Sequence, residues 1–201
     1  MSKASKIISV LFHPLLMPTL GFLILFNSGT YLGYIPFDFK KMIFLIVVLC
    51  TLVIPLSLIP FFLYQKMIFS IHMSEKRERL VPLVITFLLY FFCYYLLARI
   101  PIPPLYQAFC LSAVISVLIA LIITIKWKIS IHMTGIGGII GLIVFLIYSM
   151  RINLEFYLII SLLCAGLIGT ARLQLKAHNP PELYTGFITG LIVIPSVMLL
   201  F

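Results

Sequence analysis

Long apolar runs separated by short polar links dominate the sequence. Each of seven runs is close to the ~17–25 residues that a helix needs to cross the hydrocarbon layer of a membrane. In that layer a continuous apolar run satisfies its backbone hydrogen bonds by forming a helix. The pattern therefore predicts an all-α, polytopic membrane bundle with about six to seven transmembrane helices, in a single integral membrane domain over residues 1–201. The expected spans are about residues 7–27, 42–64, 80–99, 103–126, 133–150, 154–171 and 183–201.

Prolines modify this simple picture. A proline within a helix removes a backbone hydrogen bond and clashes with the preceding turn, so it kinks or breaks the helix. We therefore expect kinks at Pro14, Pro18, Pro55 and Pro60. Three further prolines between the third and fourth runs predict a tight hairpin there, at Pro101, Pro103 and Pro104.

Composition agrees with a membrane protein and excludes a soluble one. Hydrophobic residues make up 63% of the chain and charged residues only 9%, whereas a soluble domain has about 25% charged residues. The formal net charge of +9 does not predict a nucleic-acid partner, because the basic residues are few and lie between apolar runs. They are better suited to lipid head groups, to a phosphorylated substrate and to setting the orientation in the bilayer.

The basic residues are unevenly divided between the two ends of the predicted bundle. One end holds the N-terminus and the links near 65–79, 127–132 and 172–182, and carries ten of them: Lys3, Lys6, Lys66, Lys76, Arg77, Arg79, Lys126, Lys128, Arg172 and Lys176. The other end carries Lys40, Lys41, Arg99 and Arg151. The positive-inside rule places the basic end in the cytoplasm. If Lys76, Arg77, Arg79 and Arg172 hold a phosphate, the count falls to six against four and the preference is weak.

The inventory of reactive residues excludes several kinds of site. The four cysteines all lie within apolar runs, without metal-ligand spacing, and are interpreted as small buried residues. Of the five carboxylates, only Glu75 and Glu78 are close in sequence, so we expect no carboxylate-bound Mg²⁺. The sequence also contains no zinc motif, Walker loop or nucleophile elbow. We therefore expect a site with no metal and no cofactor, based on histidine, arginine and lysine.

Two of the four histidines lie in a repeated tetrapeptide. The sequence SIHM occurs at residues 70–73 and again at 130–133, each time at the end of an apolar run on the basic side. Either duplication of a two-helix unit or chance in a narrow composition explains the repeat. His72, His132 and His178 all fall on that side, whereas His13 is expected elsewhere, within the first span.

The segment 171–186, ARLQLKAHNPPELYTG, combines the residues needed for attack on phosphorus. Glu182 follows His178 by four residues, and a carboxylate beside an imidazole fixes its tautomer and leaves the other nitrogen as a nucleophile. Arg172 offers planar, bidentate contacts to phosphate oxygens. Pro180 and Pro181 are expected to end the preceding helix, and Gly186 to let the last span approach a neighbour.

These motifs resemble the signatures of the type-2 phosphatidic acid phosphatase superfamily of membrane lipid phosphatases, over about residues 75–190. The third signature of that family is S-R-x5-H-x3-D, and this chain has Ala171, Arg172, His178 and Glu182 at the matching positions. The second is P-S-G-H opening a helix of small residues, which here reads ISIH at 129–132, then MTGIGGIIG. The first is K-x6-R-P, and the nearest stretch is EKRERLVP at 75–82, without that spacing.

The chain departs from these signatures at defined positions. Ala171 replaces a serine that would offer a hydroxyl to phosphate, and Ile131 replaces a glycine that lets the backbone approach it. Glu182 replaces an aspartate, which keeps the charge and lengthens the reach. Two spans also separate the first and second signatures, where compact family members have a shorter connection. An inactive or repurposed member is therefore an alternative interpretation.

The resemblance implies a role for each matching residue. His178 would be the nucleophile, Glu182 would orient its ring, and His132 would act as proton donor and then as base. The phosphate would be bound by Arg172, Lys76, Arg79, Arg77 and Ser130. Two alternatives stay open for His72, which either lines the same pocket or has no role.

The favoured hypothesis from the sequence is a metal-independent lipid phosphate phosphatase that hydrolyses a phosphomonoester or pyrophosphate through a phosphohistidine. The expected partners are the lipid bilayer and a membrane lipid phosphate, in a multi-pass protein of a bacterial inner (cytoplasmic) membrane. The main alternative is a non-catalytic lipid-phosphate-binding or transport protein that keeps the phosphate pocket. A structural membrane subunit is a third interpretation. Neither the particular lipid nor the oligomeric state follows from the sequence.

Overall fold

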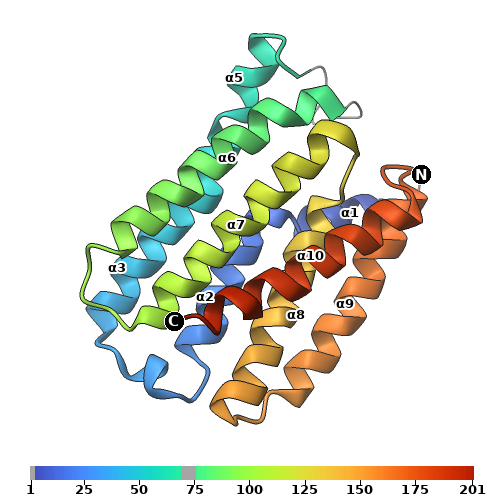
Figure 1. The fold of residues 1–201 in the computed structure, drawn as a ribbon. Coiled ribbons are helices and arrows are strands. Elements are labelled where there is room, and N and C mark those ends of the chain that lie inside the picture. The colour runs from blue at the N-terminus through green and yellow to red at the C-terminus, as the bar shows by residue number, and fades with distance from the viewer. Residues whose placement is uncertain (1–2, 69–75) are drawn as a thin grey trace.

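The chain forms a bundle of helices in the computed structural model, which describes residues 3–68 and 76–201. The helices are α1 (Lys3–Leu11), α2 (Met17–Phe26), α3 (Phe37–Val48), α4 (Ile54–Ser57), α5 (Ile59–Tyr64), α6 (Lys76–Leu97), α7 (Pro104–Lys126), α8 (Ile131–Met150), α9 (Glu155–Gln174) and α10 (Pro180–Met198). Three short helical segments connect some of them: η1 (Pro14–Leu16), η2 (Tyr31–Tyr34) and the π-helical η3 (Leu49–Val53). Figure 1 shows how these elements follow one another.

The prediction of a helical membrane bundle is confirmed. Seven helical stretches in the described residues are long and apolar enough to cross a membrane: Lys3–Phe26, Phe37–Tyr64, Glu78–Leu97, Pro104–Lys126, Ile131–Met150, Glu155–Gln174 and Pro180–Met198. Each corresponds to one of the seven apolar runs. Seven such stretches indicate a multi-pass integral membrane protein.

Prolines mark helix interruptions at three of the four predicted positions, whereas Pro18 lies within the first turn of α2. The first span breaks between Leu11 and Met17, around Pro14, and a second break at Leu58 precedes Pro60. Pro55 follows the π-helical turn of η3, which widens the helix before the new helical start. A short hairpin that contains Pro101 and Pro103 joins α6 to α7. A proline keeps the residue before it extended, so the chain stays non-helical until α7 begins at Pro104.

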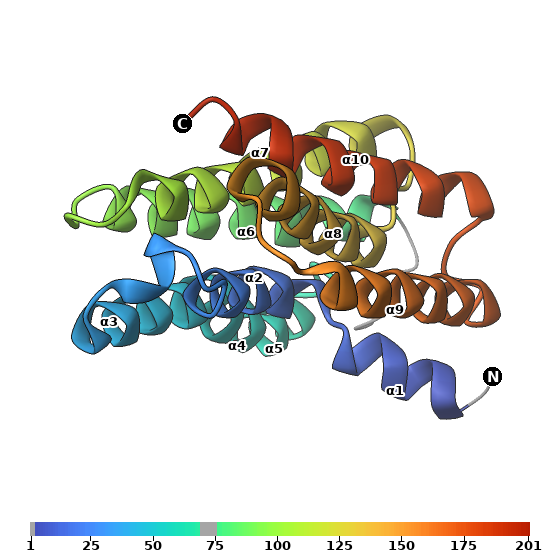
Figure 2. The same cartoon turned by 90° about the horizontal axis from the view of Figure 1, so that it is seen from below.

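Helices pack in two rough layers when the molecule is viewed from below, with α6, α7, α8 and α10 above α1, α2, α3 and α9 (Figure 2). Aromatic rings fill the core between α2 and α7. The ring centre of Phe22 lies 6.0 Å from that of Tyr106 and 5.4 Å from that of Phe109. The Tyr106 hydroxyl donates to the backbone oxygen of Leu32, which satisfies a polar group that would be costly to bury alone. Cys50, Cys93 and Cys110 are buried as expected, whereas Cys164 is only partly buried.

Glycines bring α8 and α10 into backbone contact. A Cβ atom on Gly190 would overlap the Thr134 carbonyl oxygen, and one on Gly186 would overlap the Ser130 carbonyl oxygen. A Cβ atom on Gly141 of α8 would lie 2.9 Å from the Leu191 oxygen of α10. Small residues are the usual means by which membrane helices approach closely, because lipid offers no hydrophobic force to drive them together. The predicted role of Gly186 is confirmed, and the contact brings the start of α10 against the start of α8.

The start of α1, the α7–α8 link and the α9–α10 link lie toward the same end of the bundle, at the upper right of Figure 1. The α8–α9 link and the hairpin between α6 and α7 lie toward the opposite end. This arrangement has the alternation expected for seven spans. It places the residues around Ser130, Arg172 and His178 near one another.

Replacing Gly190 with alanine is expected to destabilise the bundle by ~1–3 kcal/mol, because the added methyl group collides with backbone atoms of α8 that cannot move aside. The matched control is Gly166→Ala in α9, where a Cβ atom meets nothing within 4 Å. Thermal unfolding in detergent should show a lower midpoint for Gly190→Ala and no loss for Gly166→Ala. Equal midpoints would contradict the close helix contact.

The distribution of basic residues predicts that the end carrying Lys176 faces the cytoplasm. Both Lys176 and Asn153, at opposite ends of α9, are exposed. A membrane-impermeant thiol reagent should label Asn153→Cys in intact cells and Lys176→Cys only after the membrane is opened. The reverse labelling pattern would show that the end carrying Lys176 faces away from the cytoplasm.

Candidate functional site

A buried hydrogen bond between His178 and Glu182 forms the centre of the candidate site. His178 lies in the link before α10, and its Nδ1 is 2.6 Å from Oε2 of Glu182. The same oxygen accepts a longer bond, 3.4 Å, from the backbone N–H of Asn179, because Glu182 is the third residue of α10 in a capping box. The helix start therefore fixes the carboxylate, and the carboxylate fixes the imidazole. The sequence prediction of this pairing is confirmed.

The turn that presents His178 depends on an unusual backbone conformation at Lys176. Its φ of 51° lies in the left-handed region, which ends α9 much as a glycine would. The Ala177 N–H then donates to the Arg172 carbonyl oxygen at 3.1 Å, closing the end of the helix. The chain reverses within a few residues. Pro180 and Pro181, which were expected to end the preceding helix, instead form the first turn of α10, because α9 already ends at Gln174.

Arg79, in the first turns of α6, reaches the other nitrogen of this imidazole. Its Nη1 is 3.5 Å from His178 Nε2 and 3.5 Å from the carbonyl oxygen of Ile129. Since Nδ1–H donates to Glu182 and Nε2 faces a guanidinium donor, the geometry fits a neutral ring with its lone pair on Nε2. The two long separations are at the limit for hydrogen bonds. A stronger acceptor near Arg79 would therefore replace them readily.

Arg172 and His132 meet at Ser9 of α1. Nη1 of Arg172 donates to the Ser9 hydroxyl at 2.7 Å. Nε2 of His132 lies 3.1 Å from the Ser9 carbonyl oxygen and 3.3 Å from its hydroxyl oxygen, so this nitrogen carries the proton and donates. A second contact, between Ser5 and Gln174 at 2.6 Å, holds α1 against the end of α9.

His13 belongs to this cluster, and the prediction that it lies apart from the other histidines is wrong. Its ring centre is 5.7 Å from that of His132, edge to face. The expected single span would have carried His13 into the bilayer, away from the other three. Instead the chain breaks before Pro14, and α1 packs against α9 at a different angle from α2 (Figure 2). Sequence reasoning also missed Ser9, because its contacts with Arg172 and His132 join residues far apart in the chain.

Two buried donors in this region have no hydrogen-bond partner among the described residues. They are Nε of Arg172 and the hydroxyl of Ser130, whose residue is completely buried. Ser130 is also the residue before α8, where its side chain does not cap the helix and the first backbone N–H groups face outward from the helix start. Buried donors without acceptors are costly, and a helix N-terminus favours negative charge. Each of these groups is a donor of the kind from which an anion accepts hydrogen bonds.

The charge around His178 favours its neutral form. Burial, together with the positive charges of Arg79, Arg172 and Lys128, holds the pKa of His178 far below its usual value. A neutral imidazole with a free Nε2 is a nucleophile, whereas an imidazolium is not. The same cations that depress this pKa would attract a phosphate.

The structure thus brings together six of the predicted site residues: Arg79, Ser130, His132, Arg172, His178 and Glu182. The Ser130 N–H donates to the Glu182 carbonyl oxygen at 3.2 Å, which ties the start of α8 to the start of α10. His72 and the side chains of Lys76 and Arg77 lie outside the described residues. Within the parts of the chain that are described, no three His, Cys, Asp or Glu residues are placed to hold a metal ion.

Comparison of the chain with protein-family models, with curated proteins and with solved structures found no match.

Acidification is expected to destabilise the protein through His178. Because its folded-state pKa is depressed, the unfolded chain binds a proton that the folded chain excludes once the pH falls below ~6.5. Stability should then fall by up to ~1.4 kcal/mol for each further pH unit. Thermal unfolding in detergent between about pH 7.5 and about pH 5 should show a steeper loss for wild type than for His178→Asn. Parallel curves would show that folding does not depress the pKa of His178.

Proposed function

We propose that the protein is a metal-independent lipid phosphate phosphatase. The observation that carries the proposal is the set of buried donors around a neutral, oriented imidazole. Arg79 and Arg172 supply positive charge. The Ser130 hydroxyl and Arg172 Nε are buried donors that have no acceptor among the described residues. A tetrahedral phosphate is an acceptor of suitable charge and shape, because its oxygens take several donors at once. The sequence resemblance to membrane lipid phosphatases independently leads to the same residues.

The reaction follows from the hydrogen bonds of His178. Its Nε2 would attack phosphorus as the bond from phosphorus to the leaving oxygen breaks, giving a phosphohistidine. The Nδ1–H bond to Glu182, 2.6 Å long, would stabilise the positive charge that develops on the ring. Arg79 would exchange its long contact with Nε2 for a phosphate oxygen, and Arg172 would neutralise charge on another. Water would then displace His178 and release inorganic phosphate.

His132 would supply the proton to the leaving oxygen and then accept one from the attacking water. Its Nε2 donates to Ser9, so Nδ1 is the nitrogen available for proton transfer. To act as the acid, Nδ1 would first take a proton from solvent, which it would then give to the leaving oxygen. Ser9 would orient the ring in the way that Glu182 orients His178. His13, edge to face with His132, adds a second polar group beside it.

The bond between His132 and Ser9 also favours the second candidate, a non-catalytic lipid-phosphate-binding or transport protein. An imidazole that holds a backbone carbonyl performs a structural task, because it joins α8 to α1. Ala171, where the phosphatase signature has serine, removes one donor to the phosphate. The two functions differ in whether His178 forms a covalent bond to phosphorus, and this difference can be measured.

Phosphate release from a panel of lipid phosphates, in detergent with excess EDTA, tests the proposal. The panel would include phosphatidic acid, phosphatidylglycerophosphate and a prenyl pyrophosphate. Wild type should release phosphate, and His178→Ala should release none because the nucleophile is absent. Arg172→Ala should lower the rate ~10²–10³-fold, as loss of a donor to developing charge does. The matched control is Arg99→Ala, an exposed arginine that contacts Tyr95 at the opposite end of the bundle.

Each other outcome favours a different conclusion. Activity that survives His178→Ala would mean that another group is the nucleophile. No release from any lipid, with lipid-phosphate binding that Arg172→Ala weakens and Arg99→Ala does not, would favour the binding or transport protein. If the protein neither releases phosphate nor binds any of the lipid phosphates, the proposed phosphate site is ruled out.

A further inference from the structure

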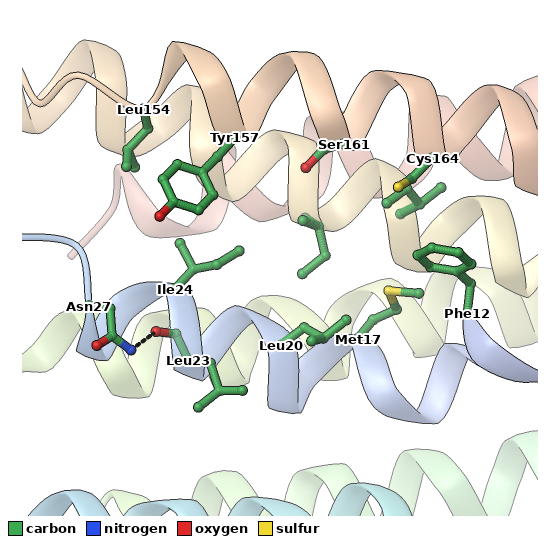
Figure 3. Close-up of a pocket in the computed structure, with 12 residues that line it drawn as sticks. Phe12, Met17, Leu20, Leu23, Ile24, Asn27, Leu154, Tyr157, Ser161 and Cys164 are labelled. Carbon is green, nitrogen blue, oxygen red and sulfur yellow. Dashed lines mark hydrogen bonds between the residues drawn. The ribbon is translucent and has the colours of Figure 1, made fainter.

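An apolar groove of about 400 Å³ lies between α2, α8 and α9 (Figure 3). Met17, Leu20 and Ile24 line it from α2, Ile136 and Ile139 from α8, and Cys164 from α9. In Figure 3 the groove extends lengthwise between α2 and α9, from Phe12, Met17 and Cys164 at one end to Asn27, Leu154 and Tyr157 at the other. Its volume is within the usual range for small-molecule sites.

One end of this groove adjoins the candidate site. Phe12 directly precedes His13, whose ring contacts that of His132. Ile136 lies one helical turn after His132, so both are on the same face of α8. Gly135 lets the Met17 side chain approach α8 at this point, because a Cβ atom there would lie 2.7 Å from the Met17 Cγ. The groove therefore begins one turn below the histidines and extends away from them.

The chemistry of the groove selects hydrocarbon. Most of its lining is aliphatic or aromatic, and the amide of Asn27 is turned to its own helix, donating to the Leu23 oxygen at 2.8 Å. All the helices that line it belong to membrane-spanning stretches. No water is present at that depth to fill an apolar groove, and hydrocarbon chains are the surrounding solvent.

We propose that this groove holds one hydrocarbon chain of the lipid whose phosphate binds at the His178 site. The inference rests on the proposed function for the identity of the head group, whereas the groove and its lining are independent of catalysis. The phosphate would lie among Arg79, Arg172 and Ser130. The chain would pass the His13–His132 pair and descend between α2 and α9.

The length of the groove indicates which lipids fit. From Met17 to Asn27, α2 rises by ~15 Å, and this stretch begins below the level of the histidines. A chain that reaches Tyr157 from the phosphate site therefore extends beyond the middle of a ~30 Å hydrocarbon layer. The groove consequently favours lipids with one long chain. Affinity should increase with chain length until the groove is filled.

Photocrosslinking with two single-chain alkyl phosphates tests this placement. Both probes have the same long chain, with a diazirine either near the phosphate or at the far end. The His178→Ala protein is used beside wild type, so that labelling does not depend on turnover. The first probe should label peptides that contain Phe12 or Cys164, and the second should label those that contain Asn27, Leu154 or Tyr157. Uniform labelling of exposed helix faces by both probes would overturn the proposal.

A matched pair of substitutions tests occupancy. Leu20→Trp fills the groove, whereas Leu163→Trp places the same side chain on the lipid-facing side of α9. Only Leu20→Trp should abolish labelling of the far-end residues and weaken binding of the long alkyl phosphate about tenfold or more, with little effect on a short-chain one. Equal labelling and equal binding in the two variants would overturn the proposed chain-binding site. If the groove is labelled as expected but no lipid phosphate is hydrolysed, the chain site stands and the proposed phosphatase activity fails.

Discussion

The rest of the structure depends on the backbone contact between α8 and α10. Four glycines remove the side chains that would otherwise separate the two helices: Gly137, Gly141, Gly186 and Gly190. This contact fixes the start of α10 against the start of α8, where the Ser130 N–H meets the Glu182 carbonyl oxygen. His178 and Glu182 therefore lie beside the hydroxyl of Ser130, which has no hydrogen-bond partner among the described residues. A bulkier residue at the contact would move the nucleophile candidate away from the donors that would hold its substrate.

Burial gives these polar residues their chemical character. Arg79, Arg172, His178 and Glu182 are all buried at one end of a chain that is otherwise strongly apolar. Two guanidinium groups beside one imidazole keep that imidazole neutral, and the carboxylate of Glu182 sets its tautomer. The charges would be costly to maintain without a function, since low-polarity surroundings weaken hydration of every ion. A bound phosphate would balance the charge, and the groove beneath the histidines would receive the attached chain.

Much of the fold could be predicted from the sequence, because span length and proline position act locally. The seven apolar runs gave the seven spans, and Pro14, Pro55 and Pro60 marked the breaks. The pairing of His178 with Glu182 was also predictable, since four residues separate them at a helix start. The place of His13 was not, because it depends on the angle at which α1 packs against α9 after the break. Ser9 was missed for the same reason, as its bonds to Arg172 and His132 join residues far apart in the chain.

The most direct test of the account is the detection of a covalent phosphohistidine. The protein would be mixed with a lipid phosphate labelled on phosphorus, quenched within the first turnover, digested and examined by mass spectrometry under conditions that preserve N-linked phosphate. The account predicts phosphate on the peptide that contains His178, and none in His178→Ala. Release of phosphate by wild type with no covalent label, or a label on another residue, would contradict it.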